Sequence, residues 1–216
     1  MRNFVNKPMA ALNMVTFPID VRIVDEFANY AALPGKLSTI TPPWKSDIQW
    51  VSAANQQAFD AFQSAFDRLD IAGHFRPHLD IEHEVRLYAG FLVIRSRCDE
   101  PQFHVDWMNA NNEALTLLTP VSSNAANFGL LYHKFSGGIG EYDYKRGEAI
   151  VFGDKFVHST KPGKSDAPVV LLCFEFGTDK MAHWPNIYST IGYQLTHICQ
   201  PDGKFVPTEL NSKRTG

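Results

Sequence analysis

Residues 147–177, GEAIVFGDKFVHSTKPGKSDAPVVLLCFEFG, decide the fold. They contain two short runs of aliphatic and aromatic residues, GEAIVFG and PVVLLCFEFG, separated by Gly, Pro, Asp and Lys, as is typical of strands joined by turns. Similar runs precede them at VRLYAGFLVIRSR (85–97), EALTLLTPV (113–121) and FGLLYHKF (128–135). Closely spaced strands of this kind predict an all-β sandwich or a small barrel.

One strong helix is expected before these strands, over residues 46–70, with Ser46 or Asp47 as its N-cap. Its aromatic residues recur at offsets of three and four, which places them on one helix face. We interpret this face as core packing and not as a cofactor-binding surface. The face consists of Phe59, Phe62, Phe66 and Leu69.

The expected architecture is a single domain, mainly β with flanking helices. Residues 1–80 would form an N-terminal helical and irregular support, residues 81–180 the β core, and residues 181–216 a C-terminal extension. No internal repeat or low-complexity segment suggests a second domain.

Bulk properties narrow the partners of the protein. The chain has 216 residues and a net charge of −3, so it offers no broad basic field for a nucleic-acid backbone. No run of about 18 apolar residues suggests a membrane span. The three cysteines are widely spaced and form no zinc or disulfide pattern, which favours a reducing, cytoplasmic location. The sequence does not indicate the oligomeric state.

The stretch FHVDW (103–107) carries the first chemical signal. On a strand, His104 and Asp106 point to the same side, because residues i and i+2 share a face. His158, which follows the run GEAIVFG and a turn, is the candidate third ligand. Two His and one carboxylate form the facial triad of non-haem iron(II) oxygenases.

A second His-x-Asp pair, His78 and Asp80 in PHLD (77–80), has the same spacing. A short motif of this kind is weak without its structural context. His104 lies between two apolar β-type runs, whereas His78 follows a helix end and a turn. The flanking runs therefore favour His104 and Asp106 as the metal-binding pair.

The segments FHVDW, EALTLLTPV, RGEAIVFGDKFVHSTKPG and PVVLLCFEFG together resemble the core of iron(II)- and 2-oxoglutarate-dependent dioxygenases. The resemblance covers roughly residues 85–177. It implies a double-stranded β-helix, the jelly-roll or cupin-like barrel, with His104, Asp106 and His158 as iron ligands. It also implies iron(II) as cofactor, 2-oxoglutarate as cosubstrate and dioxygen as oxidant.

The reaction that this resemblance implies is hydroxylation of a substrate, with release of succinate and carbon dioxide. From the size and charge of the chain we expect a small-molecule substrate, similar to an amino acid or a natural product. Two alternatives stay open. One is a cupin-like metal-binding or structural protein without this activity, and the other is a metal-dependent oxygenase or isomerase that uses no keto acid.

The chain departs from the family at the anchor of the cosubstrate. Family members place a Lys or Arg in the strand after the second His, to pair with the distal carboxylate of 2-oxoglutarate. Ten residues after His158 this chain has Pro168, and the strand PVVLLCFEF contains no basic residue. We favour Arg95 as a substitute, because an Arg side chain offers two parallel donors to a carboxylate. Other candidates for the cosubstrate site are Arg97, Thr160, Lys161, Lys164 and Tyr132.

Overall fold

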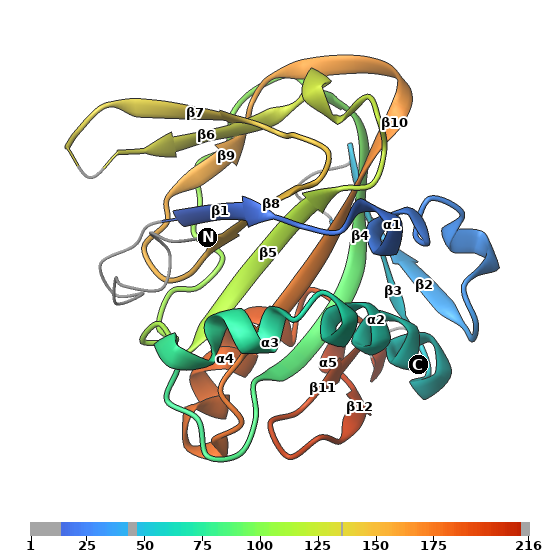
Figure 1. The fold of residues 1–216 in the computed structure, drawn as a ribbon, viewed down its shortest axis with the longest axis vertical. Coiled ribbons are helices and arrows are strands. Elements are labelled where there is room, and N and C mark those ends of the chain that lie inside the picture. Colours follow the sequence, from blue (N-terminus) through green and yellow to red (C-terminus); the bar gives the residue numbers. More distant parts are fainter. Residues whose placement is uncertain (1–13, 43–46, 135, 213–216) are drawn as a thin grey trace.

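The computed structural model describes residues 14–42, 47–134 and 136–212, and its framework is two facing antiparallel sheets (Figure 1). The smaller sheet has the order β7 (Ile139–Asp143), β6 (Gly129–His133) and β9 (His158–Thr160). The larger sheet has the spatial order β1 (Met14–Pro18), β8 (Glu148–Phe152), β5 (Ala114–Pro120), β10 (Gly163–Gly177), β4 (Arg86–Cys98), β3 (Ile48–Ala53) and β2 (Leu37–Ile40). The two sheets together confirm the predicted mainly β, double-stranded β-helix fold.

Strand β10 shows why the larger sheet is apolar on both faces. Leu172, Phe174 and Phe176 contribute to the core beneath the helices. Val169 and Cys173 contribute to the core on the opposite face. Because successive side chains of a strand alternate between faces, a strand buried on both sides appears as one continuous apolar run.

Two helices, α2 (Gln56–Arg68) and α3 (Ile71–Phe75), cover the outer face of the larger sheet (Figure 1). The predicted start of the helix at residue 46 is wrong, since residues 48–53 form strand β3. The N-cap is Asn55, whose side chain accepts a hydrogen bond from the backbone N–H of Ala58 at 3.1 Å. Ser46 lies outside the described residues.

The predicted apolar face of α2 is confirmed. Phe59, Phe62 and Phe66 are buried in the core between the helix and the sheet. The helix approaches the sheet closely at Gly90 of β4, where an added Cβ atom would lie 2.4 Å from the Cβ of Phe62. A glycine at this point lets the aromatic face of α2 rest directly on the strand.

The first 80 residues contribute more strand than we expected. Three of their segments, β1, β2 and β3, form the two edges of the larger sheet. Strand β3 pairs with β4 in register from Ile48 opposite Arg95 to Ser52 opposite Phe91. These N-terminal segments are therefore part of the barrel wall and not only a support packed against it.

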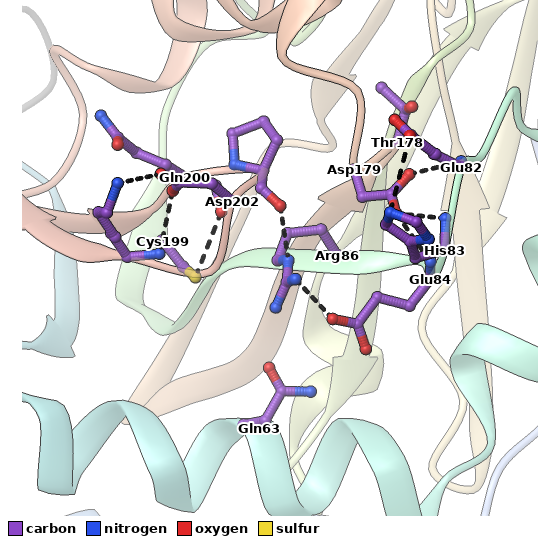
Figure 2. Close-up of polar contacts among 12 residues, drawn as sticks. Gln63, Glu82, His83, Glu84, Arg86, Thr178, Asp179, Cys199, Gln200 and Asp202 are labelled. Carbon is purple, nitrogen blue, oxygen red and sulfur yellow. Dashed lines mark hydrogen bonds and ion pairs between the residues drawn. The ribbon is translucent and has the colours of Figure 1, made fainter.

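The described segments that follow β10 lie at the lower end of the barrel (Figure 1). The carboxylate of Asp179 accepts hydrogen bonds from the backbone N–H groups of Glu82, His83 and Glu84, at 2.6–2.8 Å, which holds the segment before β4 against the end of β10 (Figure 2). None of the described helices is both long and apolar enough to cross a membrane. The shorter elements are α1 (Val21–Asp25), α4 (Trp184–Ile191), α5 (Glu209–Ser212), β11 (His197–Cys199), β12 (Phe205–Pro207) and the 3₁₀ helices η2 (Tyr30–Ala32), η3 (Arg76–His78), η4 (Ala125–Asn127) and η5 (Met181–His183).

Candidate metal centre

His104, Asp106 and His158 lie together at one wall of the barrel. One ligand atom of each residue can be chosen so that all three atoms lie within 4.8 Å of one another. The Oδ1 atom of Asp106 is 3.5 Å from Nε2 of His104 and 3.7 Å from Nε2 of His158. This is the one such group of three among the residues that the structure describes.

The pair His104 and Asp106 is not on a regular strand, so that part of the prediction is wrong. His104 forms an isolated bridge with His158, in which each backbone N–H donates to the carbonyl of the other residue at 2.9 Å. Asp106 lies in a bend. The two side chains nevertheless converge, because the bridge fixes His104 and a side-chain hydrogen bond fixes Asp106.

Both imidazoles are held by their Nδ1 atoms. Nδ1 of His104 lies 2.8 Å from the carbonyl oxygen of Gln102, and Nδ1 of His158 lies 3.1 Å from that of Phe156. When Nδ1–H donates to these carbonyls, the lone pair of each ring is on Nε2, the atom that faces Asp106. The tautomer needed for metal binding is thus selected by the backbone.

The side chain of Asp106 is oriented by a hydrogen bond from Thr116 of β5. The hydroxyl of Thr116 donates to Oδ2 of Asp106 at 3.0 Å and accepts a hydrogen bond from the indole N–H of Trp107, also at 3.0 Å. Trp107 is fully buried. This chain of hydrogen bonds leaves Oδ1 of Asp106 directed at the two imidazoles.

Burial differs sharply between the two histidines. The side chain of His104 is 57% exposed, whereas that of His158 is 6% exposed. Burial lowers the pKa of His158, the carboxylate of Asp106 opposes that shift, and His104 adds to it. The neutral imidazole, which is the metal-binding form, is therefore favoured at His158.

The triad opens onto a cavity of about 500 Å³. Apolar residues from β4, β5 and β10 form much of its wall, among them Val93, Leu118 and Leu171. Arg95 also lines the cavity, although it is only 5% exposed. A mostly apolar cavity with a few polar groups is typical of a site for a small molecule.

Arg95 lies opposite Val169 of β10 in the strand register. Its guanidinium forms an ion pair with Asp47, donates a hydrogen bond from Nε to the carbonyl of Arg97 at 3.2 Å, and lies 5.8 Å from the ring centroid of Phe128. The cation is thus already paired, at the start of β3.

Arg97, the sequence candidate two residues after Arg95, lies outside the lining of the cavity. Its side chain is 60% exposed and pairs with Asp99 at 2.9 Å. Next to Arg95 and Arg97 the β4–β10 register is irregular, because β10 takes five steps from Lys164 to Val169 while β4 takes two from Arg97 to Arg95.

Of the other four candidates for the cosubstrate site, one lines the cavity and three do not. Thr160 lines the cavity. Lys161 lies outside its lining and pairs with Glu141 at 2.7 Å and with Asp143 at 3.3 Å. Lys164 and Tyr132 also lie outside its lining.

The second His-x-Asp pair joins no group of three potential metal ligands in the part of the chain that the structure describes. His78 lies in the short helix η3, and Asp80 pairs with Lys180 and, at 3.8 Å, with His183. Neither residue belongs to the group of three ligands. The geometry thus groups the pair that the flanking strands favour, His104 and Asp106, with His158.

Sequence reasoning missed several polar residues of the cavity, among them Thr116, Tyr144 and Glu175. Tyr144 follows β7 and is buried. Glu175 is in β10, on the same face as Val169, Leu171 and Cys173, so the strand period alone could have placed it in the cavity. Burial raises the pKa of the Glu175 carboxyl well above its ordinary value, and the charge of Asp106 raises it further.

Comparison with solved structures supports the fold. The epimerase SnoN from nogalamycin biosynthesis, described as non-haem and α-ketoglutarate dependent, has 13% identity and a TM-score of 0.64, with 82% of each chain covered. A 2OG-Fe(II) oxygenase family protein from Burkholderia pseudomallei has 11% identity and a TM-score of 0.61, covering 82% of this chain and 89% of that one. HygX from Streptomyces hygroscopicus, solved with nickel and 2-oxoglutarate, has 13% identity and a TM-score of 0.55, covering 79% and 84%.

Sequence comparison alone finds no such likeness, since no protein-family model and no curated protein matches the chain. At 11–13% identity the structural matches show a shared fold and no more. They share the double-stranded β-helix of the family that the sequence resembles. The chain therefore has the fold of the iron(II)/2-oxoglutarate oxygenase structures, with a His-Asp-His triad that opens onto its cavity.

Proposed function

We propose that this protein is an iron(II)- and 2-oxoglutarate-dependent oxygenase that hydroxylates a small molecule, with release of succinate and carbon dioxide. The observation that carries this proposal is the triad of His104, Asp106 and His158 at the wall of a cavity that also contains Arg95. Structural neighbours support it, since SnoN was solved with Fe³⁺ and α-ketoglutarate and HygX with nickel and 2-oxoglutarate.

The donor set fits a metal ion of the iron(II) type. Two imidazole nitrogens and one carboxylate oxygen face a common point, and the carboxylate is oriented by Thr116. When bound, iron(II) and the keto acid supply the oxidising chemistry. The protein holds the reactants, and the apolar strands of the barrel exclude water from around them.

Arg95 is the proposed anchor for the distal carboxylate of 2-oxoglutarate. Val169 follows Pro168, the position where the family pattern expects a basic residue. It lines the cavity, and Arg95 is its partner on the neighbouring strand. A bidentate guanidinium is well suited to a buried carboxylate. The ion pair with Asp47 implies that the cosubstrate shares Arg95 with Asp47 or displaces it.

The substrate remains a small molecule in this proposal, because a cavity of about 500 Å³ matches the size of small-molecule sites. SnoN is described as an epimerase and HygX was solved with hygromycin B, so the shared fold serves more than one reaction and substrate. Hydroxylation is the outcome that we propose for this chain. We place the protein in the cytoplasm, since Cys98, Cys173 and Cys199 are all unpaired and buried.

A second candidate function has its own observation. The guanidinium of Arg95 is already neutralised by Asp47, which favours a metal-binding protein of this fold that takes no keto acid.

Anaerobic titration separates the two candidates. Metal-free protein is mixed with iron(II) and then with 2-oxoglutarate, and the visible charge-transfer band of the metal-bound keto acid is recorded. We expect the band with the wild-type protein. Metal binding without the band would favour the second candidate, and no metal binding would contradict both.

The anchor is tested in the same titration. Arg95→Ala should weaken 2-oxoglutarate binding about tenfold to a hundredfold, because a charge-assisted hydrogen bond is lost. Asp47→Asn should strengthen it, because the carboxylate that competes for Arg95 is removed. Lys164→Ala, a lysine outside the cavity, is the matched control and should bind normally. Equal binding by Arg95→Ala and wild type would refute the anchor.

A further inference from the structure

Glu175 is a carboxyl group built into the wall of the cavity. It lies on β10 opposite Thr116 of β5 and Ala89 of β4, and it is 2% exposed. It lines the same cavity as the metal triad. Its neighbours on that face of β10, Cys173 and Leu171, are apolar.

The carboxyl group has an unused acceptor. Its Oε2 atom is fully buried and has no hydrogen-bond partner among the described residues. A buried polar atom without a partner costs free energy, commonly about 1–3 kcal/mol, so its retention in a native core calls for an explanation. An atom of a bound ligand is one explanation, because Glu175 belongs to the lining of the cavity.

No cation of the described residues lies against Glu175. Arg95 also lines the cavity, but its strand partner Val169 lies six residues before Glu175 on β10. Its guanidinium forms an ion pair with Asp47. The metal triad adds a further carboxylate, Asp106, to the same cavity. The part of the cavity around Glu175 therefore holds two carboxyl groups and, among the described residues, no cation placed to pair with Glu175.

We infer that Glu175 binds a protonated amine of the substrate, so that the small molecule taken by this site carries a basic nitrogen. An ammonium group supplies both the missing hydrogen-bond donor and the missing positive charge. In apolar surroundings such an ion pair is selective, because a neutral group of the same shape leaves the carboxylate unpaired. This inference rests on the proposed function, since it assigns the substrate of that site.

The test uses two probes with the same six-carbon chain, the cation n-hexylammonium and the neutral alcohol n-hexanol. Wild-type protein is loaded anaerobically with iron(II) and 2-oxoglutarate, and each probe is titrated while the charge-transfer band is followed. Hexylammonium should bind at least about tenfold more tightly than hexanol, in line with a hydrogen bond to a charged group. The band itself reports the proposed function, so its absence would count against that function and not against Glu175.

Variants assign the preference to the residue. Glu175→Gln keeps the shape and removes the charge, so the affinity ratio of hexylammonium to hexanol should fall to about one. Cys173→Ala changes the adjacent position on the same face and should keep the wild-type ratio. The ratio is measured within each protein, so a change in cosubstrate loading does not affect it. If Glu175→Gln does not fold, equal binding of the two probes by wild-type protein would still overturn the inference.

Two results would overturn the inference. Equal binding of the two probes by loaded wild-type protein would show that the cavity has no preference for a cation. An unchanged ratio in Glu175→Gln would show that another group is responsible.

Discussion

Thr116→Val tests whether one hydroxyl group sets both the stability of the barrel and the metal affinity of its site. The hydroxyl accepts from the buried indole N–H of Trp107 and donates to Oδ2 of Asp106, each at 3.0 Å. Valine fills a similar volume but can do neither. The substitution should leave one buried donor unpaired and one metal ligand free to turn.

The two losses have different sizes and different readouts. The unpaired indole should lower the free energy of unfolding of the metal-free protein by about 1–3 kcal/mol. Loss of the group that orients Asp106 should weaken metal binding about tenfold to a hundredfold, which is about 1.4–2.8 kcal/mol. Zinc(II), which takes the same ligand types and is redox inert, is a suitable probe in a competition titration against a chromophoric chelator.

Two further variants separate these effects. Thr116→Ser keeps the hydroxyl and should preserve metal affinity. In a Trp107→Phe background the indole donor is gone, so Thr116→Val should cost less in unfolding while its effect on zinc binding persists. If Thr116→Val and Thr116→Ser bind zinc equally well, Thr116 does not orient Asp106 and the reasoning is wrong.

Three further predictions address the pair that binds metal, the packing of α2 and the lower end of the barrel. His104→Ala should weaken zinc binding by at least about tenfold, whereas His78→Ala should leave the affinity unchanged in the same competition titration; the reverse result would show that the other pair is used. Gly90→Ala should lower the free energy of unfolding by about 1–3 kcal/mol in urea denaturation, because the new Cβ atom would lie 2.4 Å from Phe62, and the cost should shrink in a Phe62→Ala background. Burial acts to raise the pKa of Asp179, but the backbone N–H groups that donate to its carboxylate leave that pKa below the ordinary value of 3.8. The ionised carboxylate therefore stabilises the folded protein above that value. This contribution to the free energy of unfolding is lost as the pH falls through the lowered pKa. Urea unfolding of Asp179→Asn across acidic pH should therefore show a smaller loss of stability below about pH 4 than wild type, and parallel curves would contradict this account.

The sequence carried much of the fold because the barrel strands bury apolar side chains on both faces. The run around Cys173 is recognisable without any knowledge of its partners. Residues 48–53 were assigned to a helix, because no strong break separates them from the aromatic periodicity that begins at Phe59. Their pairing with β4 is a long-range contact, which local patterns do not encode.

The candidate site was predictable to the extent that it depends on spacing. His104, Asp106 and His158 come together although Asp106 is not on a strand, because a hydrogen bond from Thr116 directs it. That contact lies outside any motif. Glu175 could have been found from the strand period, but an acidic residue in an apolar run gives no sign of its missing partner until the cavity is known.

The pairing of Arg95 with Val169 has a consequence for motif searches in distant relatives. A pattern that requires Lys or Arg at a fixed offset after the second His rejects this chain, which has Pro168 and Val169 there. A pattern that also accepts a basic residue at the position opposite in the strand register, on the neighbouring hydrogen-bonded strand, retains this chain. Chains discarded for lacking the basic residue can be re-examined at the cross-strand neighbour of the missing position.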